Sequence, residues 1–189
     1  MSAAIIPGPR LVVIGSASFR GADSQSLCEA VAADLAVWPP LIALTGGMGG
    51  VGLTFARAFA ESRRAAGLPE NLYHLLPRGW GPCDSGVTLG AGVDYLERRE
   101  VLGRVGHAYL IIEGGPGTVH EAAVALARGV PVIALGRTGG HAREVHLRIC
   151  HPPGGLASDW ELLGNADAPH QQVVDAVGRL VRASLAGRA

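Results

Sequence analysis

The stretch that decides the fold spans residues 107–121 and reads His107-Ala108-Tyr109-Leu110-Ile111-Ile112-Glu113-Gly114-Gly115-Pro116-Gly117-Thr118-Val119-His120-Glu121. The apolar run 107–112 predicts a buried strand, and residues 118–128 predict a helix. Three glycines between them allow positive φ angles and a close approach of a ligand to the backbone. The helix start then offers unpaired N–H groups and a positive dipole end to an anion. The stretch therefore predicts a strand–helix unit with a phosphate cradle for a nucleotide-like ligand.

Apolar runs alternate with helical patterns along the rest of the chain, which is typical of a parallel α/β sheet. The patterns predict strands at 11–15, 41–45, 72–76, 107–112 and 130–135, and helices at 24–37, 51–66, 93–105, 118–128 and 170–185. Asp23 or Ser24 is the expected N-cap of the first helix. Residues 77–92, 137–141 and 151–169 are expected to be loops or irregular. We therefore predict one Rossmann-like, doubly wound domain over residues 1–189, with a mostly parallel sheet and helices on both faces.

Ligands of open α/β sheets bind beyond the carboxyl ends of the strands. Four predicted loops lie there, at 15–21, 46–50, 113–118 and 136–141, and all are rich in Gly, Ser or Thr. The alternative interpretation is ordinary turn chemistry without a ligand. The loops do not form a GxGxxG motif, so they do not indicate a normal NAD site. The candidate ligand- and phosphate-binding residues are Gly15, Ser16, Gly46, Gly47, Arg98, Gly114, Gly115, Gly117, Thr118, Thr138 and Gly139.

Arg98 and Glu121 are the charged residues with the clearest alternative roles. Thr118-x-x-Glu121 matches a capping box, in which Glu121 would only cap its own helix. In the functional interpretation, its carboxylate faces the ligand and stabilises a developing oxocarbenium ion. Arg98 either pairs with a neighbouring glutamate or clamps a phosphate. The histidines and cysteines show no metal-binding spacing, so no metal site is predicted.

The composition excludes several classes of protein. All 16 basic residues are arginine, so neither a P-loop lysine nor the Schiff-base lysine of a pyridoxal-phosphate enzyme is present. The formal net charge is zero, so the sequence lacks the excess positive charge that is typical of nucleic-acid-binding proteins. No apolar run is long enough to span a bilayer, and residues 1–10 do not resemble a signal peptide. With only Cys28, Cys83 and Cys150, we expect a cytoplasmic protein without disulfides.

The segment from Gly114 to Glu121 resembles the GGxGTxxE signature of the Lonely-guy (LOG) superfamily. The resemblance covers most of residues 10–180. It implies a Rossmann-like fold and, together with apolar helix faces, a homo-oligomer, either a dimer or a tetramer. Many members carry the name lysine decarboxylase, a pyridoxal chemistry that this lysine-free chain cannot perform.

Two branches of that superfamily resemble the chain. The cytokinin-activating branch hydrolyses the N-glycosidic bond of nucleoside 5′-monophosphates, and its catalytic Arg and Glu fall on Arg98 and Glu121. Its following Lys is replaced by Arg99, and the Pro of its PGG by Glu113. The molybdenum cofactor carrier-like branch is the closer match, through segments 45–47, 129–133 and 138–140. It implies a binding protein for a phosphorylated pterin or nucleotide, such as molybdenum cofactor or a nucleoside monophosphate, and its motif does not establish catalysis.

Overall fold

The fold is built on a six-stranded, wholly parallel sheet in the computed structural model, which describes residues 7–188. The prediction that no signal peptide is present rests mainly on residues outside this range. The strands have the spatial order β4-β3-β2-β1-β5-β6. In chain order they are β1 (Arg10–Gly15), β2 (Ile42–Thr45), β3 (Leu72–Leu76), β4 (Val87–Gly90), β5 (Ala108–Ile112) and β6 (Val132–Leu135).

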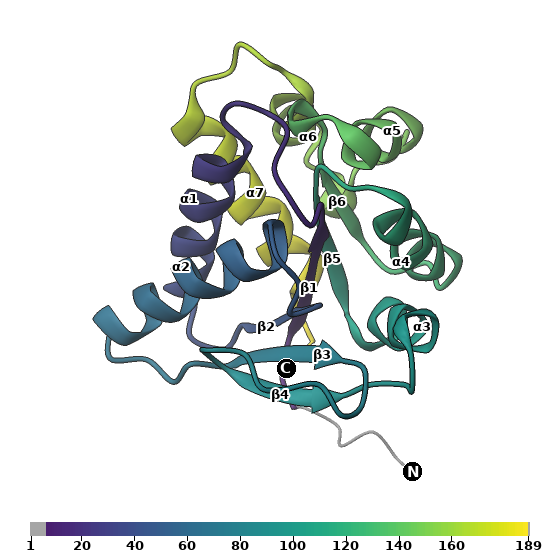
Figure 1. Ribbon diagram of the computed structural model, residues 1–189. Coiled ribbons are helices and arrows are strands. Elements are labelled where there is room, and N and C mark those ends of the chain that lie inside the picture. Colours follow the sequence, from purple (N-terminus) through teal and green to yellow (C-terminus); the bar gives the residue numbers. More distant parts are fainter. Residues whose placement is uncertain (1–6, 189) are drawn as a thin grey trace.

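Helices cover both faces of the sheet, as predicted for a doubly wound Rossmann-like fold (Figure 1). One face carries α1 (Ser24–Ala36), α2 (Val51–Ala65) and α7 (His170–Leu185), and the other carries α3 (Tyr95–Val105), α4 (Pro116–Ala127) and α5 (Gly140–Arg148). Helix α6 (Ala157–Gly164) packs against α7 and β6. Short 3₁₀ turns lie at η1 (Gly136–Thr138) and η2 (Pro153–Gly155). No helix in the described range is both long and apolar enough to cross a bilayer.

The central strands read as unbroken apolar runs because both of their faces are covered. Every residue of β5 is buried, and so is every residue of β2. Strand β1 lies between them, with Val13 aligned to Leu110 of β5 and to Thr45 of β2. This packing explains why the apolar runs alone were enough to predict the core strands.

Three elements were not predicted from the sequence. Strand β4 lies inside the predicted loop 77–92, and α5 and α6 occupy segments that were expected to be polar or irregular. Strand β4 pairs only with β3 at the sheet edge and is half-exposed, so it has no apolar run. Helices α5 and α6 are short, and two glycines with positive φ, Gly139 and Gly140, stand at the start of α5. Asp23 occupies the N-cap position of α1, but its side chain makes no capping hydrogen bond; the carboxylate accepts a hydrogen bond from Arg137 instead.

The order of the strands reverses at β1, and this reversal locates a crevice. From β1 the chain passes through β2 and β3 to β4 on one side, and it then crosses to β5 on the other side. The loops that follow β1 and β5 therefore diverge at the carboxyl end of the sheet. The glycine loop that follows β2 closes the same region.

Candidate functional site

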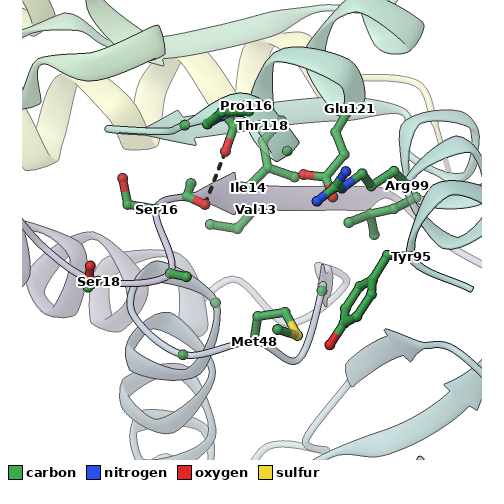
Figure 2. A pocket seen from close by; sticks show the side chains of 18 of the residues that line it. Val13, Ile14, Ser16, Ser18, Met48, Tyr95, Arg99, Pro116, Thr118 and Glu121 are labelled. Carbon is green, nitrogen blue, oxygen red and sulfur yellow. Dashed lines mark hydrogen bonds between the residues drawn. The ribbon is translucent and has the colours of Figure 1, made fainter.

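A cleft of about 290 Å³ lies at the carboxyl end of β1 (Figure 2). Its walls come from β1 and the following loop, the glycine loop after β2, the inner side of α3 and the first turns of α4. The structure thus brings together residues far apart in the sequence. Of the predicted site residues, those lining the cleft are Gly15, Ser16, Gly46, Arg98, Gly115, Gly117, Thr118 and Glu121.

Helix α4 opens directly into this cleft. It begins at Pro116, with Gly115 as an extended N-cap, and proline suits this first helical position. The N–H groups of Gly117 and Thr118 lie in the first turn, where a helix has no acceptor of its own to offer them. Both residues line the cleft. The start of α4, where the phosphate cradle was predicted, is therefore an open helix start that borders the cleft, and such a start is a geometry that binds anions.

The predicted capping box at Thr118 and Glu121 is wrong. The helix begins two residues before Thr118, so Thr118 is not the N-cap. Its hydroxyl instead donates to the carbonyl of Gly15 over 3.1 Å and ties α4 to the end of β1 (Figure 2). Glu121 therefore does not form a capping box with Thr118, and its carboxylate faces Arg98 of α3.

Arg98 and Glu121 form a buried ion pair in the cleft wall. Nη1 of Arg98 donates to Oε1 of Glu121, and Nη2 donates to the carbonyl of Gly46 over 3.3 Å. The two side chains are only 6% and 8% exposed. Burial raises the pKa of the Glu121 carboxyl, and the charge of Arg98 opposes that rise. Within residues 7–188 the buried Nε of Arg98 has no hydrogen-bond partner.

Arg99, rather than Arg98, stands beside the open start of α4. A Cβ added to Gly117 would lie 3.2 Å from Nε of Arg99. Consecutive residues of a helix cannot face the same way, so Arg98 turns to Glu121 while Arg99 reaches the cradle. Arg20, from the loop after β1, also lines the cleft. The sequence indicated the Arg98–Arg99 pair, but the clamp was assigned to Arg98; Arg20 was not predicted.

Glu113 is a structural residue that the sequence analysis did not assign. It is 2% exposed, and its carboxylate accepts N–H groups of Arg20 at 3.0 Å and Gly21 at 2.8 Å. Burial alone would raise the pKa of Glu113, but these backbone donors outweigh it and the pKa is lowered. Its backbone has φ 54°, in the left-handed region. Glu113 therefore fixes the loop after β1 against the motif loop.

Four predicted ligand-binding residues do not line the cleft: Gly47, Gly114, Thr138 and Gly139. The Thr138 hydroxyl accepts the N–H of Glu113 and donates to the Leu135 carbonyl. The amides of His141 and Ala142, at the start of α5, donate to the carbonyls of Gly114 and Glu113. The loop 136–141 therefore does not line the cleft but holds the backbone of Glu113 and Gly114 in place.

Gly114 and Gly47 make hydrogen bonds that hold the loops around the cleft together. The Gly114 amide donates to Oγ of Ser16 over 2.9 Å, and its φ of 111° suits only glycine. The Gly47 amide donates to Oγ1 of Thr45 over 3.0 Å. Within the described chain, no group of three or more His, Cys, Asp or Glu side chains could hold a metal ion.

Comparison with known proteins gives one family and several similar folds. The model of the SLOG cluster4 family matches residues 9–151. No curated protein matches the sequence. The solved structure of the protein TM1055 is 25% identical, with a TM-score of 0.60 over 75% of this chain and 82% of that one.

Two further structures share the fold at lower identity. The molybdenum cofactor binding protein of Rippkaea orientalis is 21% identical, with a TM-score of 0.56 over 67% of this chain and 76% of that one. The molybdenum cofactor carrier protein of Chlamydomonas reinhardtii is 17% identical, with a TM-score of 0.59 over 92% and 98% of the two chains.

Proposed function

The chain belongs to the SLOG cluster4 family, and from this premise we propose that it binds a phosphorylated, nucleotide-like ligand in the cleft. The observation that carries the proposal is the open first turn of α4, whose residues Gly117 and Thr118 line the cleft beside Arg99. A phosphate there would accept backbone N–H groups and a guanidinium together. Charge-assisted hydrogen bonds of this kind each contribute about 1.5–3 kcal/mol.

Other features of the cleft favour the same kind of ligand. The start of α2 also borders the cleft through Gly52, so a second helix dipole is positive toward it. The buried Nε–H of Arg98 is a donor that a ribose or phosphate oxygen would satisfy. A volume near 290 Å³ is at the small end of ligand pockets, which favours a mononucleotide-sized molecule.

A binding or carrier role, with molybdenum cofactor as one candidate cargo, is the finer form of the proposal. It rests on the sequence resemblance to the carrier-like branch and on the shared fold. The state of Glu121 also supports it, because this carboxylate already accepts Arg98. A carboxylate whose charge is neutralised by a buried guanidinium stabilises a developing oxocarbenium ion less than a free one does.

N-glycosidic hydrolysis of nucleoside 5′-monophosphates is the second candidate function. The placement of Arg98 and Glu121 in the cleft lining favours it, since the resembling hydrolase branch uses these two positions. Release of free base from a panel of nucleoside monophosphates distinguishes the two functions. Turnover by wild type that is lost in Glu121→Gln, with ligand affinity retained, would establish the hydrolase; binding without turnover would establish the carrier.

Calorimetric titration with adenosine monophosphate and ribose 5-phosphate tests the binding proposal. Gly117→Val would place a side chain in the cradle, where its Cβ meets only the flexible end of Arg99. We expect the variant to fold and to bind neither compound. Unchanged affinity in Gly117→Val would refute the assignment of the cradle.

We further propose that the protein is a cytoplasmic homo-oligomer. Its three cysteines are free thiols, which suits a reducing compartment. Exposed apolar side chains lie on the neighbouring helices α3 and α4, at Leu96, Val101, Val119 and Leu126. Such a surface is typical of an interface between copies. Sedimentation equilibrium would show a dimer or a tetramer, and a monomer at all concentrations would contradict this proposal.

A further inference from the structure

We propose that the ligand carries a planar heteroaromatic ring and that Tyr95 binds this ring by stacking. The inference rests on the proposed function, because it describes the other end of the same ligand. Tyr95 lines the cleft. Figure 2 shows its ring with Met48 on one side of the cleft, while Pro116 and Thr118 lie on the opposite side. The cleft thus has a phosphate-binding side and an aromatic side.

The position of Tyr95 is fixed before any ligand arrives. It is the first residue of α3, and the preceding Asp94 caps the helix by accepting the N–H groups of Leu96 and Glu97, each at 2.9 Å. The Glu97 carboxylate in turn accepts the N–H of Val93 at 3.0 Å. These contacts hold the backbone at the start of α3, so less has to be ordered when a ligand binds to the ring.

Trp80 supports Tyr95 from outside the cleft. The two rings meet edge-to-face, with centroids 5.3 Å apart and an interplanar angle of 76°. This edge-to-face arrangement covers at most one face of the Tyr95 ring, and Tyr95 also lines the cleft, where a ligand could stack on the ring. Trp80 is 51% exposed and Tyr95 38%. Two large aromatic side chains left this exposed beside a cleft indicate a surface that a ligand covers.

The spacing along α3 limits the length of the ligand. Tyr95 and Arg99 are four residues apart and therefore lie on the same face of the helix. Their Cα atoms are separated by about 6 Å along the helix axis. Arg99 stands beside Gly117, so one face of α3 presents both the stacking residue and a cation beside the phosphate position. With a cleft of about 290 Å³, this arrangement favours a nucleoside monophosphate, or a phosphorylated pterin of similar length, over a dinucleotide.

Parallel titrations of phosphates with and without an aromatic base test the inference. Adenosine and guanosine monophosphates carry a heteroaromatic base, and ribose 5-phosphate lacks one. Base–aromatic stacking is worth enough that Tyr95→Ala should weaken binding of both nucleotides about 5- to 100-fold. It should leave ribose 5-phosphate affinity unchanged. Tyr95→Phe should retain nucleotide binding, and so should the control Leu147→Ala, whose side chain is exposed on α5 outside the cleft lining.

Tryptophan fluorescence supplies a second readout. We expect the nucleotides to change the emission of wild type but not of Trp80→Phe, because Trp80 contacts the stacking ring. Nucleotide affinity unaltered by Tyr95→Ala, or an equal loss for ribose 5-phosphate, would overturn the stacking role while leaving phosphate binding intact. If wild type bound none of the three compounds, the proposed function itself would fail, and this inference with it.

Discussion

Removing the charge of Glu121 should destabilise the fold, because it leaves the Arg98 guanidinium buried without a counter-charge. Both side chains are less than a tenth exposed, and they contact each other directly. Breaking a buried pair by deleting one partner costs about 3–5 kcal/mol. Glutamine at 121 can still accept a hydrogen bond, so we expect Glu121→Gln to lower the free energy of unfolding by about 3 kcal/mol, the low end of this range. For a chain of this size, each kcal/mol lowers Tm by about 2–4 °C, which gives a shift of about 6–12 °C.

A double variant separates the charge effect from general damage. In Arg98→Met/Glu121→Met, both charges are replaced by apolar groups of similar length, so most of the lost stability should return. About 1 kcal/mol should stay lost because the Gly46 carbonyl no longer has its Arg98 donor.

Urea and thermal denaturation of these variants measure the effect. The control is Glu100→Gln, because Glu100 pairs with Arg104 and His120 on the surface; this change should have only a small effect on stability. A Glu121→Gln cost as small as that of the control would refute the reasoning. A double variant as unstable as the sum of its single variants would refute it as well.

Three further outcomes are expected. The folded state lowers the pKa of Glu113, so the stabilisation by this carboxylate should be complete above pH 4.5, its ordinary pKa, and be lost as the pH falls below that value. In Glu113→Gln, the free energy of unfolding should depend less on pH in that range. An unchanged slope would contradict the role of the carboxylate. Burial lowers the pKa of His74, so stability should also fall as the pH drops below 6.5, and this loss should diminish in His74→Gln but persist in the exposed control His151→Gln. Arg99→Gln should weaken ribose 5-phosphate binding about 10- to 100-fold by calorimetry, whereas Arg143→Gln on the exposed side of α5 should not; equal effects would show only a loss of overall positive charge.

The sequence was sufficient to predict the parts of the fold that repeat a strong physical pattern. Buried strands such as β5 are unbroken apolar runs, and the long helices α2 and α7 have regular apolar spacing. Strand β4 could not be found because it is a half-exposed edge strand whose partner, β3, is fixed by tertiary pairing. Helices α5 and α6 follow glycine- and proline-rich segments that resemble loops when read without their packing partners.

The candidate site was predictable to the extent that it follows the strand ends. The loops after β1, β2 and β5 meet at the cleft, as their glycines and serines indicated. The loop 136–141 has the same composition but supports the cradle through α5, and composition cannot distinguish a supporting loop from a binding loop. Tyr95 and Met48 gave no motif, because their role depends on where α3 and the glycine loop lie in space.

A nuclear magnetic resonance titration of the ¹⁵N-labelled protein with ribose 5-phosphate tests the central claim most directly. The compound contains the proposed phosphate anchor and lacks an aromatic base, so it probes the start of α4 without the stacking position. We predict saturable shifts of the amide resonances of Gly115, Gly117 and Thr118, with smaller changes elsewhere. Saturation without movement of these three amides, or shifts centred on another helix start, would contradict the phosphate cradle on which the account depends.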